Sequence, residues 1–176
     1  EVMRDACGRV VRELAETPDG IRRHADTVWD AQGHVAAHGV DGAWRRIERD
    51  GAGRVTRDID ASGVAVGYEW DQRGLLTGAT DPTGVTSTYD YDLRGRLVAQ
   101  TMPGDRTTTW GYDLSGRVAS MTDPAGVVTR FDRNANGAVV AERRGSIGWA
   151  RTLDALGREV ARNGTDGTEH RYRYDQ

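Results

Sequence analysis

The 176-residue sequence contains no lysine and a single cysteine, Cys7. One cysteine excludes an internal disulfide framework and a zinc site built from several cysteines. The sequence also lacks any run of about 18 apolar residues, so it predicts no transmembrane helix. The formal net charge is −3, whereas nucleic-acid-binding domains usually carry a strongly basic surface. These absences argue against a disulfide scaffold, a membrane span and a nucleic-acid partner.

What the sequence does contain is one motif, repeated about every 21 residues. An Asp, or once an Asn, is followed three residues later by Gly, and an aromatic residue often precedes it. The Asp or Asn stands at positions 5, 30, 50, 71, 92, 113, 134 and 154, and Asp175 continues the series without the Gly, at intervals of 20 or 21 residues after a first interval of 25. Self-similarity at a fixed period indicates a repeat architecture. We therefore expect the whole chain, residues 1–176, to form one array of about eight repeats.

Each repeat reads as two short strands and two turns. Residues 71–74 form one turn, because Asp can bond the backbone ahead of it and Gly tolerates a positive φ. Residues 81–84, Asp-Pro-Thr-Gly, form the other. The runs 75–80 and 85–91 between these turns are rich in aliphatic, β-branched and aromatic residues, which favours strands. The fold prediction is all-β, made of repetitive antiparallel β-hairpins with two strands per repeat.

Two units, Tyr91-Asp-Leu-Arg-Gly-Arg-Leu97 and Tyr112-Asp-Leu-Ser-Gly-Arg-Val118, closely resemble the RHS or YD-repeat family. This resemblance covers essentially the whole chain and is strongest from about 68 to 140. It implies a β-sheet that spirals into a hollow shell, which in bacterial toxins of this kind encloses a C-terminal toxic polypeptide. It also implies that the chain is secreted or lies at a cell surface, with flanking repeats and an enclosed toxin or cargo polypeptide as partners. Neither the core segment of the family nor a toxin domain is recognisable, so we expect a fragment of the shell wall.

The residues that define the repeat are expected to act structurally. They are Asp30, Gly33, Trp70, Asp71, Gly74, Asp81, Pro82, Gly84, Tyr89, Tyr91, Asp92, Gly95, Arg96, Trp110, Tyr112, Asp113, Gly116, Arg117, Asp123, Pro124, Gly126, Asn134, Gly137, Asp154, Gly157, Tyr174 and Asp175. Each Asp is expected to cap its own turn, and the Arg that follows Gly is expected to pair with nearby acids. We predict no catalytic residue, cofactor or metal.

Two further patterns could indicate a metal or catalytic site, but each is explained better by the repeat structure or is incomplete. Asp132-Arg-Asn-Ala-Asn-Gly137 matches the first half of a calcium loop, but Arg143 stands where the bidentate acid belongs. The four histidines show neither metal spacing nor a partner nucleophile. The chain also lacks the elbow and phosphate-loop motifs of common enzymes.

The sequence leaves two alternatives open. The aromatic residues, if exposed, could bind a surface glycan or a protein instead of packing within the sheet. Two repeats also make four strands in about 42 residues, the length of a β-propeller blade. A propeller would restart strand pairing after every four strands, whereas a continuous sheet would pair each hairpin with the next.

Overall fold

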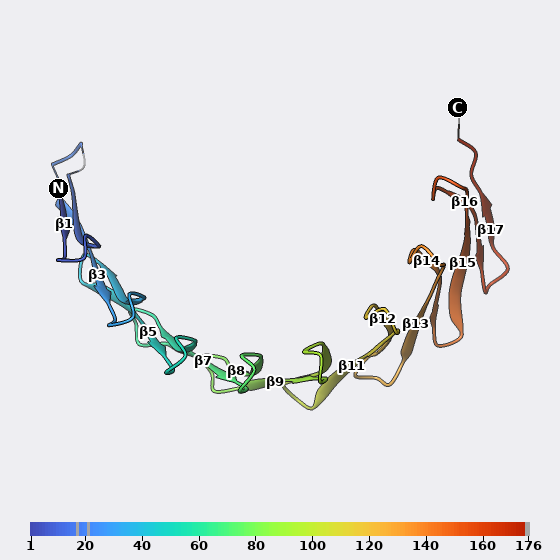
Figure 1. The fold of residues 1–176 in the computed structure, drawn as a ribbon, viewed down its shortest axis with the longest axis horizontal. Coiled ribbons are helices and arrows are strands. Elements are labelled where there is room, and N and C mark those ends of the chain that lie inside the picture. Colours follow the sequence, from blue (N-terminus) through green and yellow to red (C-terminus); the bar gives the residue numbers. More distant parts are fainter. Residues whose placement is uncertain (17, 21, 175–176) are drawn as a thin grey trace. The chain divides into compact units, whose positions relative to one another are not determined.

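The computed structural model describes residues 1–16, 18–20 and 22–174, and this part of the chain consists of 17 β-strands and connecting turns without a helix (Figure 1). The strands are β1 Val2–Arg4, β2 Val10–Glu16, β3 Arg22–Trp29, β4 Val35–Val40, β5 Ala43–Arg49, β6 Val55–Ile59, β7 Ala65–Trp70, β8 Leu76–Thr80, β9 Thr86–Tyr91, β10 Leu97–Met102, β11 Arg106–Tyr112, β12 Val118–Thr122, β13 Val128–Arg133, β14 Val139–Arg144, β15 Ile147–Leu153, β16 Glu159–Gly164 and β17 Glu169–Arg171. No helix in the described part is therefore long and apolar enough to cross a membrane.

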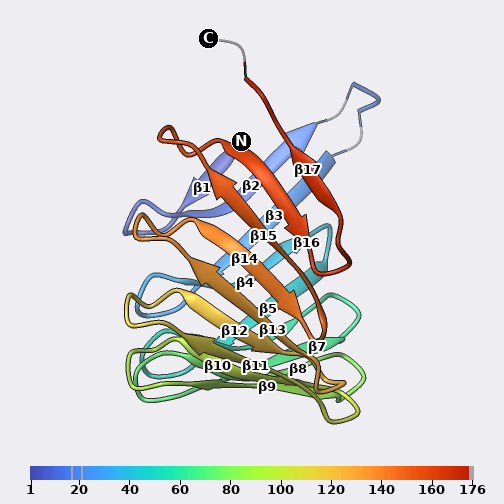
Figure 2. The same ribbon diagram turned by 90° about the vertical axis from the view of Figure 1, so that its right-hand side faces the viewer.

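The chain divides into two compact units, residues 1–88 and residues 89–176, and β9 begins in the first and ends in the second. Within each unit, every strand pairs antiparallel with its neighbour in the sequence. Figure 2 shows β14 to β17 of the second unit side by side in chain order. The predicted all-β array of antiparallel hairpins is confirmed.

Strand pairing does not restart after every fourth strand. Val40 of β4 lies opposite Ala43 of β5, and Thr80 of β8 lies opposite Thr86 of β9. In the second unit, β12 and β13 pair as well. A propeller needs a break somewhere in each run of four strands, and neither unit contains one. The propeller alternative is therefore wrong.

A β-bulge recurs once per repeat, next to the turn that carries the aromatic-Asp motif. Glu69 faces Gly78 and Trp70 faces Leu76, so Thr77 is an extra residue on the outgoing strand. The same shift of register occurs in the hairpins β1–β2, β3–β4, β5–β6, β11–β12, β13–β14 and β15–β16. A bulge bends its strand and increases the local twist. Each repeat therefore adds one bend at the same edge of the sheet.

The sheet has little interior of its own. Among the described residues, Ile59 and Ala141 are the buried apolar side chains, each 7% exposed, and Thr129 is 4% exposed. No described side chain is completely enclosed. Because so few described side chains are buried, each repeat depends on the repeats beside it, as in solenoid proteins.

Candidate functional site

The turn at Asp71 shows how one carboxylate shapes a hairpin end. The Asp71 N–H donates to the Leu75 carbonyl at 2.9 Å, and the Gly74 N–H donates to the Asp71 carbonyl at 3.1 Å. Asp71 Oδ1 accepts the N–H groups of Arg73 and Leu75 at 2.8 and 2.9 Å. Gly74 has a φ of 84°, a conformation that residues with a Cβ rarely adopt. The aspartate and the glycine together fix this turn.

The same pair of backbone hydrogen bonds occurs in the turns at both ends of the strands. The two backbone bonds recur at Asp5, Asp30, Asp50, Asp92, Asp113, Asn134 and Asp154 at one end, and at Asp60, Asp81 and Asp123 at the other. Pro82 and Pro124 occupy the second position of the turns that Asp81 and Asp123 begin. Asp175 lies outside the described residues, so its expected turn stays a prediction.

A side-chain hydrogen bond closes the open end of several hairpins. The indole N–H of Trp70, at the end of β7, donates to the carbonyl of Val55 at the start of β6, at 2.7 Å. Backbone pairing of β6 with β7 is described only from Arg57 to Ile59, so this bond spans the part of the hairpin beyond the ladder. We call this bond the latch.

The latch recurs with changing side chains but at a constant place. Its acceptor is always the second residue after the turn glycine, and its donor is the residue before the next turn Asp or Asn. The other examples are Trp29 Nε1 to Val10 at 2.8 Å, Tyr112 Oη to Leu97 at 2.6 Å, Arg133 Nη2 to Val118 at 3.1 Å and Tyr174 Oη to Glu159 at 2.8 Å. The latch residues thus bond within their own hairpin.

At four of these turns, an arginine connects the turn to the next aromatic side chain. Arg54 donates from Nε to Asp50 Oδ2 at 2.7 Å, and its guanidinium lies 5.9 Å from the centre of the Trp70 ring. Its Nη1 also donates to the Asp71 carbonyl, at 2.6 Å, in the following turn. The same triad is formed by Asp5, Arg9 and Trp29, by Asp92, Arg96 and Tyr112, and by Asp154, Arg158 and Tyr174. At these four turns the pairing predicted for the arginine after Gly is confirmed.

Arg117 lies closer to the glycine of the next turn than Arg9 and Arg96 do, whose Nη1 atoms would be 3.6 Å from a Cβ placed on Gly33 and Gly116. The Nη1 of Arg117 would be 1.8 Å from a Cβ placed on Gly137, the glycine of the next turn. Gly126 has a similar φ, 79° against 83°, but nothing lies within 4 Å of a Cβ placed there.

We expect Gly137→Ala to destabilise its hairpin more than Gly126→Ala does. Both alanines would be held in the left-handed region, at a cost of about 1–2 kcal/mol. Only the alanine at 137 would also displace the Arg117 guanidinium. Native-state hydrogen exchange of β13–β14 and β12–β13 in the two variants measures the difference. Equal effects would show that Arg117 moves aside without cost.

Sequence reasoning overlooked one of the turns opposite the aromatic-Asp turns. Asp41 and Gly42 form a two-residue turn between β4 and β5, with φ values of 50° and 86°. The irregular segment 141–150, where Gly145 and Gly148 suggested a shifted turn, has a turn at residues 145–146, between β14 and β15. The Asp-Gly pair was the available signal, because such a pair with both φ values positive is typical of two-residue hairpin loops.

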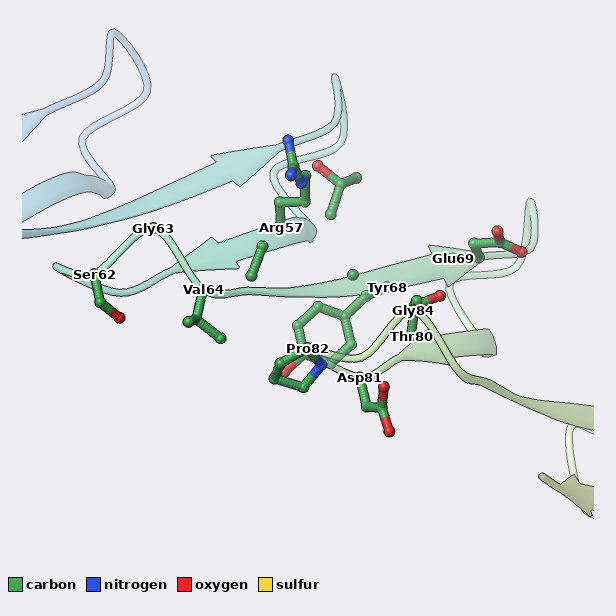
Figure 3. Close-up of a pocket in the computed structure, with 13 residues that line it drawn as sticks. Arg57, Ser62, Gly63, Val64, Tyr68, Glu69, Thr80, Asp81, Pro82 and Gly84 are labelled. Carbon is green, nitrogen blue, oxygen red and sulfur yellow. The ribbon is translucent and has the colours of Figure 1, made fainter.

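A cleft of 720 Å³ lies beside β7 in the first unit (Figure 3). The Tyr68 ring lies on one side of the strand near Val64 and Pro82, while Arg57 extends from the other side. The carboxylate of Asp81 accepts the N–H groups of Thr83 and Val85, so it is already engaged in its own turn. The Ser62 hydroxyl, which also lines the cleft, donates to Asp60 Oδ1 at 2.7 Å, so it too is engaged in its own turn.

The remaining sequence candidates lie apart from one another. Asn134 Oδ1 accepts the Ala138 N–H, as the turn register predicts, and Asp132 lies 3.5 Å from Arg143. His34 contacts Asp30 of its own turn at 3.3 Å. Within the described ranges, no group of three His, Cys, Asp or Glu side chains is placed to hold a metal ion.

The fold and the repeated turn define a class of protein, the β-hairpin repeat proteins. The sequence pattern of the RHS Repeat family matches residues 49–86, 70–107, 91–128 and 112–146, which together cover more than half of the chain. The chain therefore belongs to the RHS Repeat family. No curated protein matches its sequence.

Solved structures with the same fold come from much longer chains. One, described as TcdB2-TccC3-TEV, is 18% identical with a TM-score of 0.67, and the match covers 99% of this chain and 11% of that one. Another, TcdB2-TccC3 without its hypervariable C-terminal region, is 17% identical with a TM-score of 0.68 and the same coverage. TcdB2-TccC3-Cdc42 is 15% identical with a TM-score of 0.64, covering 89% and 10%. The chain thus spans about a tenth of the length of these similar structures.

Proposed function

We propose that residues 1–176 are one non-catalytic array of about eight repeats within the wall of a larger RHS-type shell. The main support is that the Asp, Arg and aromatic side chains of the repeat motif are engaged in bonds within the sheet. At four turns the Asp, the Arg and the aromatic residue bond to each other or to the backbone of the hairpin they belong to. We therefore propose that the repeat-defining residues act structurally, by holding the hairpins of one continuous sheet together.

We further propose that the shell encloses a toxin or another cargo polypeptide and acts outside the cell that makes it. Support comes from the similar fold in TcdB2-TccC3 and from its description as a chain with a hypervariable C-terminal region. The small number of buried side chains among the described residues fits this role, because a wall needs no large core of its own. Flanking repeats and the enclosed polypeptide are the partners that follow.

Glycan binding is less well supported by the geometry. A sugar-binding aromatic ring needs an accessible face, but arginines lie over Trp29, Trp70, Tyr112 and Tyr174, at 4.3 to 5.9 Å from the ring centres. The polar edge of each of these rings is already bonded to a carbonyl.

Protease protection tests the wall function in the full-length protein that carries these repeats. We expect its cargo region to resist digestion in the wild type and to become cleavable when Trp70→Ala opens a hairpin. Leu93→Ala is the matched control, because Leu93 is fully exposed at a turn tip. Digestion of the cargo in the wild type, at the rate of the isolated cargo, would contradict enclosure.

A further inference from the structure

Two neighbouring repeats depart from the usual arrangement. In the first, Ala138 stands where five other turns have Arg, and Leu153 stands where an aromatic donor is expected. In the second, Glu159 stands where an aliphatic residue is usual. Leu153 and Glu159 lie directly opposite each other in the β15–β16 pair. Leucine cannot donate a hydrogen bond, so the β14–β15 hairpin cannot be closed by the usual residue.

Arg151 replaces the missing donor from two positions earlier on the same strand. Its Nε donates to the Val139 carbonyl at 2.6 Å, and Val139 is the second residue after the turn glycine. That carbonyl is the acceptor position of every other latch. Residues two apart in a strand point to the same face, so Arg151 can reach the site that a residue at 153 would occupy.

This replacement brings two like charges together. Arg151 lies directly opposite Arg162, and like charges in that position repel. Glu159 holds both: Oε1 and Oε2 accept from Arg162 at 2.7 and 2.9 Å, and Oε2 lies 3.5 Å from Arg151 Nη1. The Trp149 ring packs beside both guanidinium groups, at 5.6 and 4.9 Å. We call Trp149, Arg151, Glu159 and Arg162 the polar latch.

The polar latch and the aromatic latches depend on different forces. An indole or phenol bonded to a carbonyl is neutral, so dissolved salt affects it little. The polar latch relies on ion pairs whose arginines are 27% and 41% exposed, and such pairs are screened by salt. The hydrogen bond from Arg162 also holds the pKa of Glu159 below its ordinary value, so Glu159 stays ionised at neutral pH.

We propose that the polar latch makes the β14–β16 segment a salt-sensitive opening point of the array. Increased ionic strength loosens Glu159 from its two arginines, Arg151 leaves the Val139 carbonyl, and the β14–β15 hairpin opens before its neighbours. This property belongs to one hairpin, and it holds whether or not the chain encloses a polypeptide.

Hydrogen exchange of the full-length protein at 0.05 and about 1 M NaCl tests this proposal. Exposed ion pairs contribute up to about 1 kcal/mol each, so we expect exchange in residues 139–164 to accelerate about three- to tenfold at high salt. Segments with aromatic latches, such as β6–β7 and β10–β11, should change less, because their Asp50–Arg54 and Asp92–Arg96 ion pairs are screened too but the latch bond itself is neutral. Equal salt responses in all hairpins, or none in β14–β16, would overturn the proposal.

Three variants separate the polar latch from a general loss of structure. Glu159→Gln should raise exchange at low salt and remove most of the salt response. Leu153→Tyr should restore a neutral donor near Val139, slow the exchange and also reduce the salt response. Leu156→Ala, at a 77% exposed turn position of the same repeat, should behave like the wild type. A Glu159→Gln protein that kept the full salt response would refute the role of the ion pairs.

Discussion

Acidification should unfold the hairpins in one steep transition below about pH 4. In the turns described above, nine aspartates have a lowered pKa: Asp5, Asp30, Asp50, Asp60, Asp71, Asp81, Asp92, Asp123 and Asp154. For Asp71 and Asp92 the largest cause is the backbone N–H four residues ahead, and for Asp50 and Asp154 it is the arginine after Gly. Protonation of each carboxylate weakens these bonds.

The direction of the effect follows from linkage between proton binding and folding. A carboxyl group with a lowered pKa in the folded state stabilises that state above its unfolded pKa of about 3.9. The contribution is lost as the pH falls through the lower folded value. Because many turns share this property, unfolding takes up several protons and the transition is steep. Circular dichroism from pH 6 to pH 2 measures its midpoint and slope.

Asparagine provides a control for this prediction, because the chain already uses it. Asn134 accepts the Ala138 N–H at 3.0 Å in the same turn frame without a titrating group. Changing Asp71, Asp92 and Asp123 to Asn should therefore make the acid transition shallower and shift its midpoint to lower pH. An unchanged slope would show that the turn carboxylates do not govern acid unfolding.

The sequence was sufficient to predict the repeat and its turns, but it did not predict the side-chain hydrogen bonds between strands. The positions of Asp and Gly predicted the turns, since Asp71 and Gly74 act through their own backbone neighbours. Trp70 and Leu76, which both stand at recurring positions of the repeat, lie directly opposite each other. These features are local, so they can be read from a few adjacent residues.

The latches were not predicted, because each joins two atoms that lie far apart in the sequence. The replacement of Leu153 by Arg151 also requires knowing which atoms meet across β14 and β15. A spacing of 15 residues between donor and acceptor, as in Trp70 and Val55, recurs through the chain. It is the signal by which sequence reasoning could have found them.

Removing one aromatic latch should destabilise its hairpin strongly. In Trp70→Ala the ring packing, the Arg54 contact and the bond to the Val55 carbonyl are all lost. We expect a cost of roughly 2–4 kcal/mol, somewhat below that of a wholly buried tryptophan because Trp70 is half-buried. Native-state hydrogen exchange of β6–β7 in the full-length protein measures this change.

Trp70→Phe isolates the hydrogen bond, because it keeps most of the ring and removes the N–H. The Val55 carbonyl then loses its donor, and we expect a cost of about 1 kcal/mol. The matched control is Trp44→Phe, since the Trp44 indole N–H has no hydrogen-bond partner among the described residues and its ring lies over Gly39. Trp44→Phe should change stability by less than about 0.5 kcal/mol, as is usual for exposed positions. Equal losses in the two phenylalanine variants would mean that the rings alone hold the hairpins together and that the latch bond adds nothing.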